Sequence, residues 1–196
     1  NVRAGGARNP LYRGTFVFDN DFAALLPDTP AGEYREGDLL IAQSERGLCR
    51  VVCFSPDHSL TLAQMSEEAI LGVVDTWVAQ YEEIGALPWI NYVQIFENKG
   101  EIMGCSNPHP HGQIWSNGAL PQIPGIEQQT LSDYRGSHGS CMLCDYAALE
   151  DARQERMVCS NDHFAAMVPF WATWPFETMI VARGHVGSLS DLDDDG

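Results

Sequence analysis

The sequence predicts an α+β fold in which a mainly antiparallel sheet packs against helices. Two observations predict it: short strand-like runs follow one another in hairpin-like order, and one long amphipathic helix interrupts them. A third observation is an internal repeat whose second copy is incomplete. The sequence therefore indicates a first domain over residues 1–125, and a linker with the start of a second, truncated domain over residues 126–196.

The first domain shows the clearest secondary-structure patterns. Short apolar runs that predict strands cover 14–18, 38–43, 48–54 and 90–96, and the second and third of these are expected as a pair. A turn-rich connector covers 27–37. Residues 66–85 are the clearest helix, because apolar side chains recur at intervals of three and four, and Ser66 followed by two glutamates is typical of a helix N-terminus.

The internal repeat consists of two pairs of similar runs. Residues 20–27 (Asn-Asp-Phe-Ala-Ala-Leu-Leu-Pro) return as residues 161–169 (Asn-Asp-His-Phe-Ala-Ala-Met-Val-Pro), with one residue inserted. Residues 51–58 have a looser echo in residues 178–185, and each of these runs joins an apolar strand to a loop histidine. Because both pairs occur in the same order, we interpret them as a duplication rather than a coincidence.

Composition excludes several classes of partner. The net charge is −16, with 11 Lys and Arg residues against 27 Asp and Glu residues, which argues against binding a nucleic-acid backbone. No apolar run approaches the roughly 18 residues that span a bilayer, so no membrane partner is expected. The first residues hold no apolar signal core, and six cysteines in a chain of this length do not make a secreted disulfide scaffold. We therefore expect a cytoplasmic protein.

Residues 107–114 (Asn-Pro-His-Pro-His-Gly-Gln-Ile) carry the most specific chemistry in the chain. Two prolines favour an extended backbone, and side chains alternate faces in a strand, so we expect His109, His111 and Gln113 on one side. An imidazole there can ligate a metal, carry a proton or act as a nucleophile. A His-x-His pair by itself is equally compatible with a plain polar sheet face.

A nucleophilic histidine places definite demands on its surroundings. The attacking nitrogen must be neutral and free, so the other ring nitrogen has to be held by an acceptor, often a backbone carbonyl. Attack on a phosphodiester phosphorus makes a phosphoramidate, which suits a two-step transfer because imidazole leaves well once it is protonated. Gly112 lets the backbone or the substrate approach closely, and Gln113 and Ser106 can donate to phosphate oxygens.

The whole run over residues 104–115, with its leading Gly-Cys-Ser, resembles the active-site signature of the galactose-1-phosphate uridylyltransferase family in the histidine-triad superfamily. The similarity extends over residues 1 to about 189. The resemblance implies tandem histidine-triad-like repeats and a uridylyl-histidine intermediate on His111. It also implies that Gln113 and Ser106 contact phosphate. Histidine-triad hydrolases carry a third histidine at the position of Gln113, so this glutamine favours transfer.

The same resemblance implies the substrates and their contacts. UDP-glucose and galactose-1-phosphate would exchange a uridylyl group by a ping-pong mechanism, in galactose metabolism (the Leloir pathway) and in a homodimer. Asn20 and Asp21 match the family's contacts to the nucleotide ribose, and Asn98 matches another substrate contact, although these residue types are also plain turn formers. Two alternatives stay open. One is a related nucleoside-diphosphate-sugar or dinucleotide phosphorylase in which His111 carries AMP, and the other is an inactive truncated remnant that only binds nucleotide.

A first zinc site is also implied by the resemblance. His58 and His109 match zinc ligands of the family, whose usual partners form a Cys-x-x-Cys pair just upstream of the Asn-Val-Arg with which this chain begins. Two histidines do not close a structural zinc site, which needs four ligands. The alternative for His58 alone is a solvated loop histidine.

A second metal site is indicated in the later part of the chain. Cys141-x-x-Cys144 has the spacing of a zinc knuckle, and His185 is the repeat counterpart of His58, so three ligands of a second zinc site are present. Glu127 falls where some relatives of the family use a glutamate to bind iron, and a surface carboxylate is the alternative for it.

Overall fold

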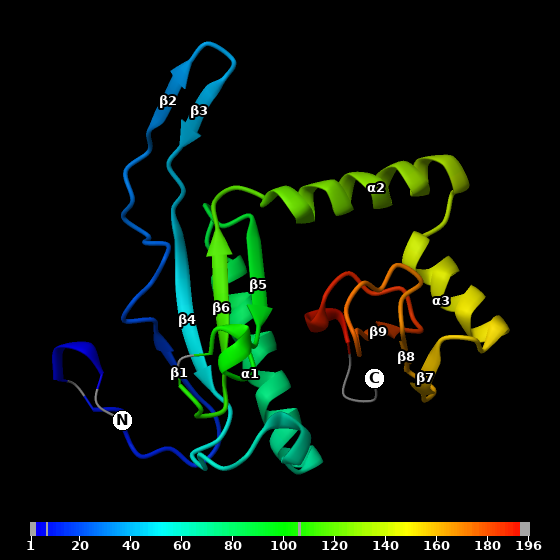
Figure 1. The fold of residues 1–196 in the computed structure, drawn as a ribbon, viewed down its shortest axis with the longest axis horizontal. Coiled ribbons are helices and arrows are strands. Elements are labelled where there is room, and N and C mark those ends of the chain that lie inside the picture. Colours follow the sequence, from blue (N-terminus) through cyan, green and yellow to red (C-terminus); the bar gives the residue numbers. More distant parts are fainter. Residues whose placement is uncertain (1–2, 7, 106, 193–196) are drawn as a thin grey trace. The chain divides into compact units, whose positions relative to one another are not determined.

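The computed structural model describes residues 3–6, 8–105 and 107–192, and these residues form the predicted α+β architecture with antiparallel sheets and three α-helices (Figure 1). The chain divides into two compact units, Asn1–Pro121 and Gln122–Gly196. The predicted domain boundary after residue 125 lies inside helix α2 (Gln122–His138), with which the second unit begins.

The first unit is built on a four-stranded antiparallel sheet. In spatial order its strands are β1 (Phe16–Asp19), β4 (Gly47–Cys53), β6 (His111–Asn117) and β5 (Tyr92–Phe96). Strand β6 therefore has a partner on each side: His111 lies opposite Cys53 of β4, and Gln113 lies opposite Phe96 of β5. Pairing on both sides fixes the register at the start of β6.

Helix α1 (Glu67–Gly85) covers one face of this sheet (Figure 1). It confirms the predicted helix, and Ser66 is its N-cap, with the Oγ accepting a hydrogen bond from the Ala69 N–H at 3.3 Å. The buried core between helix and sheet consists of Val52, Phe54, Val73, Ile84, Ile90 and Ile114. Burying such side chains, at roughly 1.5–3 kcal/mol each, holds the helix on the sheet.

Alternation along β6 divides its side chains between the two faces of the sheet. Ile114 and Ser116 are buried, and Ile114 belongs to the core under α1. His111, Gln113 and Trp115 alternate with them and lie half-buried on the opposite face. The face that α1 leaves uncovered therefore carries the polar side chains of the histidine motif.

A two-stranded hairpin departs from the predicted order. Strand β2 (Glu33–Glu36) falls in the predicted turn-rich connector and pairs with β3 (Leu40–Gln43). Gly37, with a φ of +58°, supports the tight connection between them. The chain then runs on from β3 into β4 without reversing (Figure 1), so the expected pairing of these two strands is wrong. Every residue of the hairpin strands is exposed, so the sequence shows no alternating burial pattern there.

The second unit contains α2, α3 (Met142–Arg153) and a three-stranded antiparallel sheet in the order β7 (Met157–Ser160), β8 (Phe164–Met167) and β9 (Met179–Ala182). Helix α2 occupies part of the predicted linker. None of its residues is buried, which explains why its sequence shows no apolar stripe. Short 3₁₀ helices in the described chain lie at Ala4–Gly6, Leu62–Gln64, Glu101–Met103 and Leu189–Asp191. Among the described helices, none combines the length and the apolar character needed to cross a membrane.

The two copies of the repeat share a turn but not every strand. The Asn20 Oδ1 accepts from the Phe22 N–H at 3.0 Å, and the Asn161 Oδ1 accepts from the Phe164 N–H at 2.6 Å, so each Asn-Asp pair forms a turn stabilised by its asparagine. The residues after this turn form strand β8 in the second copy and no strand in the first. The second pair of similar runs, residues 51–58 and 178–185, includes a strand in both copies: the end of β4 in the first and β9 in the second.

Candidate active site

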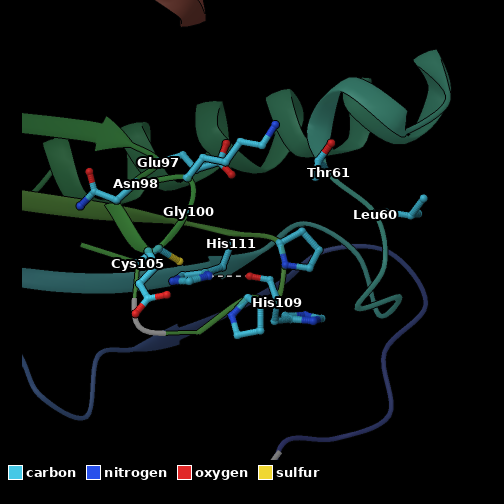
Figure 2. Close-up of a pocket in the computed structure, with 12 residues that line it drawn as sticks. Leu60, Thr61, Glu97, Asn98, Gly100, Cys105, His109 and His111 are labelled. Atoms are coloured by element: carbon cyan, nitrogen blue, oxygen red, sulfur yellow. Dashed lines mark hydrogen bonds between the residues drawn. The ribbon is translucent and has the colours of Figure 1, made fainter. Parts of the chain in front are cut away.

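Two cavities at the start of β6 share His111 as a lining residue. The first, of about 430 Å³, is lined by Asn20, Asp21 and Gln113 together with His111. The second, of about 490 Å³, is lined by Asn98 together with His111 (Figure 2). The structure therefore gathers these five predicted site residues around two cavities that share one imidazole.

The imidazole of His111 is held in a single tautomer. Its Nδ1 lies 2.7 Å from the backbone carbonyl oxygen of His109 (Figure 2). A carbonyl oxygen only accepts, so Nδ1 carries the proton and Nε2 of the neutral ring keeps its lone pair. Among the described residues, Nε2 has no hydrogen-bond partner. This is the arrangement that a nucleophilic imidazole requires.

His109 lies before β6 rather than within it. The strand begins at His111, so the prediction of an extended strand through both histidines is wrong for the residues before it. Pro108 and Pro110 explain the difference, because neither has a backbone N–H to donate to a neighbouring strand. The carbonyl of Pro110 accepts from the Phe54 N–H at 3.0 Å, and the His109 side chain is only 3% exposed.

His109 forms a close pair with His58. The two Nδ1 atoms lie 2.9 Å apart and the ring centroids 4.3 Å apart. The Nε2 of His109 lies 3.0 Å from the hydroxyl of Tyr12, and burial is the main cause that lowers the pKa of His109. Two converging imidazole nitrogens are ligand atoms of the type that zinc accepts, and an outer partner such as Tyr12 is typical of such a histidine. The predicted pair therefore fits half of a tetrahedral zinc site.

Asp21 has an ion-pair partner that the sequence did not reveal. Its carboxylate lies 2.5 Å from Nη2 and 3.1 Å from Nε of Arg3, and it accepts a further bond from the Ala4 N–H at 3.1 Å. The hydrogen bond from Arg3 is the main cause that lowers the pKa of Asp21. Arg3 also lies 4.3 Å over the ring of Phe18. The wall of the first cavity is thus an ion pair rather than a free carboxylate.

The second cavity carries charged groups that the sequence did not single out. Lys99, the only lysine in the chain, lines it beside Asn98. Glu97 lines it as well, and burial raises the pKa of this carboxyl, while the charges of Lys99 and His111 oppose the rise. The cavity therefore offers an ammonium group and an amide to an anionic ligand.

Gln113 and Gly112 serve opposite faces of the sheet. The Oε1 of Gln113 accepts a hydrogen bond from the Trp115 indole N–H at 3.2 Å on the cavity face. A Cβ on Gly112 would lie 2.8 Å from the ring of Phe54 and 3.0 Å from the carbonyl oxygen of Phe96. Because Gly112 has no side chain, the ring of Phe54 and the backbone of Phe96 can pack closely against strand β6.

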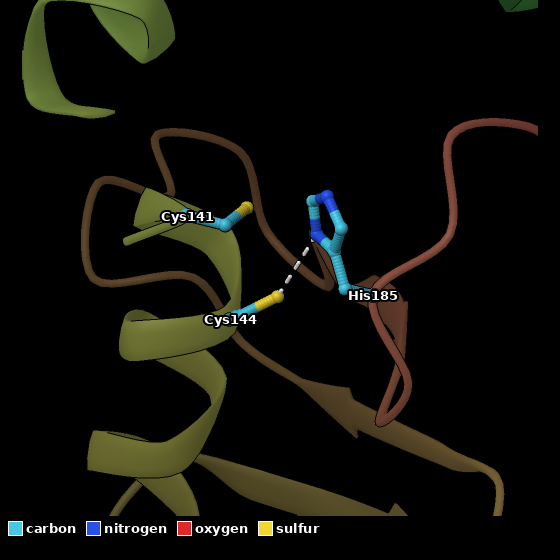
Figure 3. Close-up of side chains that lie close together, drawn as sticks. All are labelled: Cys141, Cys144 and His185. Carbon is cyan, nitrogen blue, oxygen red and sulfur yellow. Dashed lines mark hydrogen bonds between the residues drawn. The ribbon is translucent and has the colours of Figure 1, made fainter. Parts of the chain in front are cut away.

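In the second unit, Cys141, Cys144 and His185 come together (Figure 3). Their ligand atoms lie within 4.8 Å of one another, and the Cys144 Sγ is 3.4 Å from the His185 Nδ1. Cys141 is the N-cap residue of α3, and the backbone N–H of Cys144 is the main cause that lowers the pKa of its thiol. Two cysteines from one helical turn and one histidine fit three positions of a tetrahedral zinc site.

Two further predicted site residues remain, Ser106 and Glu127. Ser106 lies outside the described residues. Glu127 is exposed on α2, and it does not belong to the one cluster of three or more metal-binding side chains found among the residues that the structure describes.

Comparisons with known proteins agree over both units. The family described as galactose-1-phosphate uridyl transferase, N-terminal domain, matches residues 1–121, and the C-terminal domain of the same name matches residues 127–196. The galactose-1-phosphate uridylyltransferase of Haemophilus influenzae is 50% identical over 195 residues, which is 100% of this chain and 55% of that protein. The chain spans about half the length of the curated relatives it matches.

Solved structures show the same similarity. A uridylyltransferase mutant superimposes with a TM-score of 0.87 at 26% identity, covering 97% of this chain and 60% of that one. An ADP-glucose phosphorylase from Arabidopsis thaliana, solved with bound ADP-glucose, superimposes with a TM-score of 0.76 at 26% identity, covering 93% of this chain and 55% of that one.

Proposed function

The chain belongs to the galactose-1-phosphate uridyl transferase family, and on that premise we propose that its protein exchanges a uridylyl group between UDP-glucose and galactose-1-phosphate. The observation that supports this proposal most directly is the hydrogen bond from His111 Nδ1 to the His109 carbonyl, because it leaves Nε2 free to attack phosphorus. The relatives at about half identity are named for galactose-1-phosphate and uridylyl transfer, and UDP-glucose is the donor that the family resemblance implies.

The proposed reaction has two displacements at one phosphorus atom. The lone pair of His111 Nε2 forms a bond to the α-phosphorus of UDP-glucose, and the bond from that phosphorus to the bridging oxygen breaks, so glucose-1-phosphate leaves with the electron pair. A phosphate oxygen of galactose-1-phosphate then attacks the same phosphorus, the N–P bond breaks, and UDP-galactose forms. The His109 carbonyl stabilises the positive ring of the intermediate through the Nδ1 proton.

The two cavities suggest where each part of the substrate binds. The uridine ribose would lie in the first cavity, where the Asn20 amide nitrogen is free to donate because the Oδ1 is used in the turn. The leaving phosphate would lie in the second cavity, where Lys99 and Asn98 compensate its charge. Gln113 would donate to the oxygens of the phosphorus under attack, and the predicted contact from Ser106 would join it.

A second candidate function follows from the similarity to the ADP-glucose phosphorylase. In that case His111 would carry AMP, and the acceptor in the second displacement would be inorganic phosphate. The chemistry at Nε2 is the same, so the base and the acceptor distinguish the two functions.

Covalent labelling tests the proposed function. Incubating the full-length protein with UDP-glucose and no acceptor should add one uridylyl group per chain, measured by intact-mass spectrometry, and galactose-1-phosphate should then remove it. ADP-glucose should label poorly. Labelling by ADP-glucose in preference to UDP-glucose would instead establish the AMP-carrying function. A folded sample that forms neither adduct would contradict a nucleophilic His111 and support the inactive, nucleotide-binding alternative.

Two metal sites belong to the same proposal. Zinc suits the cysteine and histidine ligands of the cluster in the second unit, and it suits the His58 and His109 pair in the first. In the first unit, zinc would hold the loop that supplies the His109 carbonyl to His111. The described residues give Glu127 no partner for iron. The homodimer and the cytoplasmic location stay predictions.

Metal analysis of two cysteine variants tests the second site. Cys144→Ser should lower the zinc content of the full-length protein by one equivalent per chain, because the serine hydroxyl is a poor zinc ligand. Cys159→Ser is the matched control, since Cys159 is a free, exposed cysteine of β7 outside the cluster. Mass spectrometry of the metals gives the stoichiometry. Equal zinc contents in both variants and the wild type would exclude a zinc ion on Cys144.

A further inference from the structure

We propose that Trp115 is a positioning residue for the transfer reaction. It holds the side-chain amide of Gln113 with the oxygen turned away from the substrate and the NH₂ group turned toward it. This inference rests on the proposed function, in which Gln113 donates to the oxygens of the phosphorus that His111 attacks. No part of it requires Trp115 itself to touch the substrate.

The hydrogen bond between the two side chains sets the orientation of the amide. The Trp115 Nε1 lies 3.2 Å from the Gln113 Oε1. An indole N–H is a donor only, so the atom that it meets has to be the amide oxygen. Residues two apart on a strand point to the same face, which places this contact on the cavity face of β6. The NH₂ group of Gln113 is then left to donate into the cavity that Gln113 lines.

Trp115 is well suited to hold this orientation because it is itself fixed. Its ring packs edge-on against the ring of Phe96, with centroids 5.8 Å apart and an angle of 75° between the planes. It lies in an inner strand of the sheet, opposite Cys49 of β4 and Gln94 of β5. In the described chain, Trp115 lines neither of the two cavities that share His111. Its influence on the reaction therefore passes through Gln113.

The two ends of a carboxamide have almost the same shape but opposite polarity. Without the indole N–H, the amide of Gln113 can turn by half a rotation at little energetic cost. Its oxygen would then face the phosphate oxygens. The partial negative charge of the amide oxygen would be repelled by the negative phosphate, and no hydrogen bond would form. Trp115 removes this unproductive orientation before the substrate arrives, which is electrostatic preorganisation.

The substitution Trp115→Phe tests the proposal, because it keeps an aromatic ring and removes only the N–H and part of the ring. We expect the single-turnover rate of uridylyl transfer from UDP-glucose to fall roughly tenfold, with little change in KM. The matched control is Trp174→Phe. Trp174 is 78% exposed, belongs to the second unit and lines neither of the two cavities that share His111, so that variant should keep the wild-type rate.

A double-mutant cycle separates positioning from a general structural effect. If Trp115 acts through Gln113, then Trp115→Phe should cause no further loss of rate in a Gln113→Ala background. An equal loss in both backgrounds, or a wild-type rate for Trp115→Phe alone, would overturn the proposal.

A measurement on the ground state keeps the proposal independent of turnover. The indole Nε1–H resonance of Trp115 in the proton–nitrogen NMR spectrum should move when Gln113 is replaced by alanine, and that of the exposed Trp174 should not. A Trp115 resonance that stays in place would show that the hydrogen bond does not form. Failure of the wild type to form any uridylyl adduct would overturn the proposed function instead, while the NMR result still decides whether Trp115 holds Gln113.

Discussion

Replacing His111 with alanine is expected to abolish transfer, with a fall in the turnover of UDP-glucose of about 10⁴-fold or more. The physical reason is that the reaction loses its nucleophile, and no second imidazole nitrogen among the described residues has the same environment. His109 is buried and both of its ring nitrogens are engaged, one with His58 and one with Tyr12. The measurement is the steady-state rate, together with the intact mass after incubation with UDP-glucose.

A matched control separates chemistry from folding in this experiment. His163→Ala removes an exposed histidine of the second unit and should leave turnover unchanged. The unfolding free energy of His111→Ala should stay near the wild-type value, because His111 is only half-buried and outside the core cluster. A variant that lacks His111 but still turns over at a near-normal rate would remove the covalent mechanism.

The sequence predicts those parts of the fold whose pattern is local. Helix α1 shows an apolar period and the Ser66 cap, and both appear in the structure. Strand β3 confirms the predicted strand over 38–43, but the sequence does not predict its partner β2 or helix α2, because neither of these buries a face that would impose a period on the sequence. An element can therefore be recognised from the sequence most readily where it buries one face and so shows a periodic apolar pattern.

In the candidate site, too, the sequence predicts the contacts between near neighbours in the chain and misses those between distant residues. His111 and Gln113 lie two apart on one strand, so their common face follows from the sequence alone. The Arg3 partner of Asp21 does not, because the two residues are 18 positions apart and meet only in the folded chain. The same alternation rule places Trp115 on this face beside Gln113. Because an indole N–H can only donate, the sequence also contained the signal that predicts its hydrogen bond to the Gln113 oxygen.

The position of His109 shows how one residue can hold two parts of the site. Its side chain meets His58, and its backbone carbonyl fixes the tautomer of His111. The sequence suggested both imidazoles but placed them on one strand. The backbone bends at residues 109–110, where the prolines keep the chain out of the sheet, and there the carbonyl of His109 meets the His111 ring.

Gly112→Ala is expected to lower the free energy of unfolding by about 1–3 kcal/mol and to slow transfer as well. The new methyl group would lie 2.8 Å from the ring of Phe54 and 3.0 Å from the backbone oxygen of Phe96. Phe54 is only 2% exposed and packs against Trp77, so its ring has no space to move into. Strand β6 must therefore shift, and that shift displaces the nucleophile beside Gly112.

The same substitution elsewhere in the chain provides the control. A Cβ on Gly72, inside helix α1, would meet no heavy atom within 4 Å beyond its chain neighbours and the helix's own backbone, so Gly72→Ala should be neutral or stabilise the protein by up to about 1 kcal/mol through helix propensity. Denaturant titration of both variants gives the two free energies, and the single-turnover rate reports the position of His111. If Gly112→Ala unfolded at the same free energy as the wild type and transferred uridylyl at the same rate, close packing beneath β6 would not be what positions the nucleophile. A large loss of rate without any loss of stability would point instead to contact between Gly112 and the substrate.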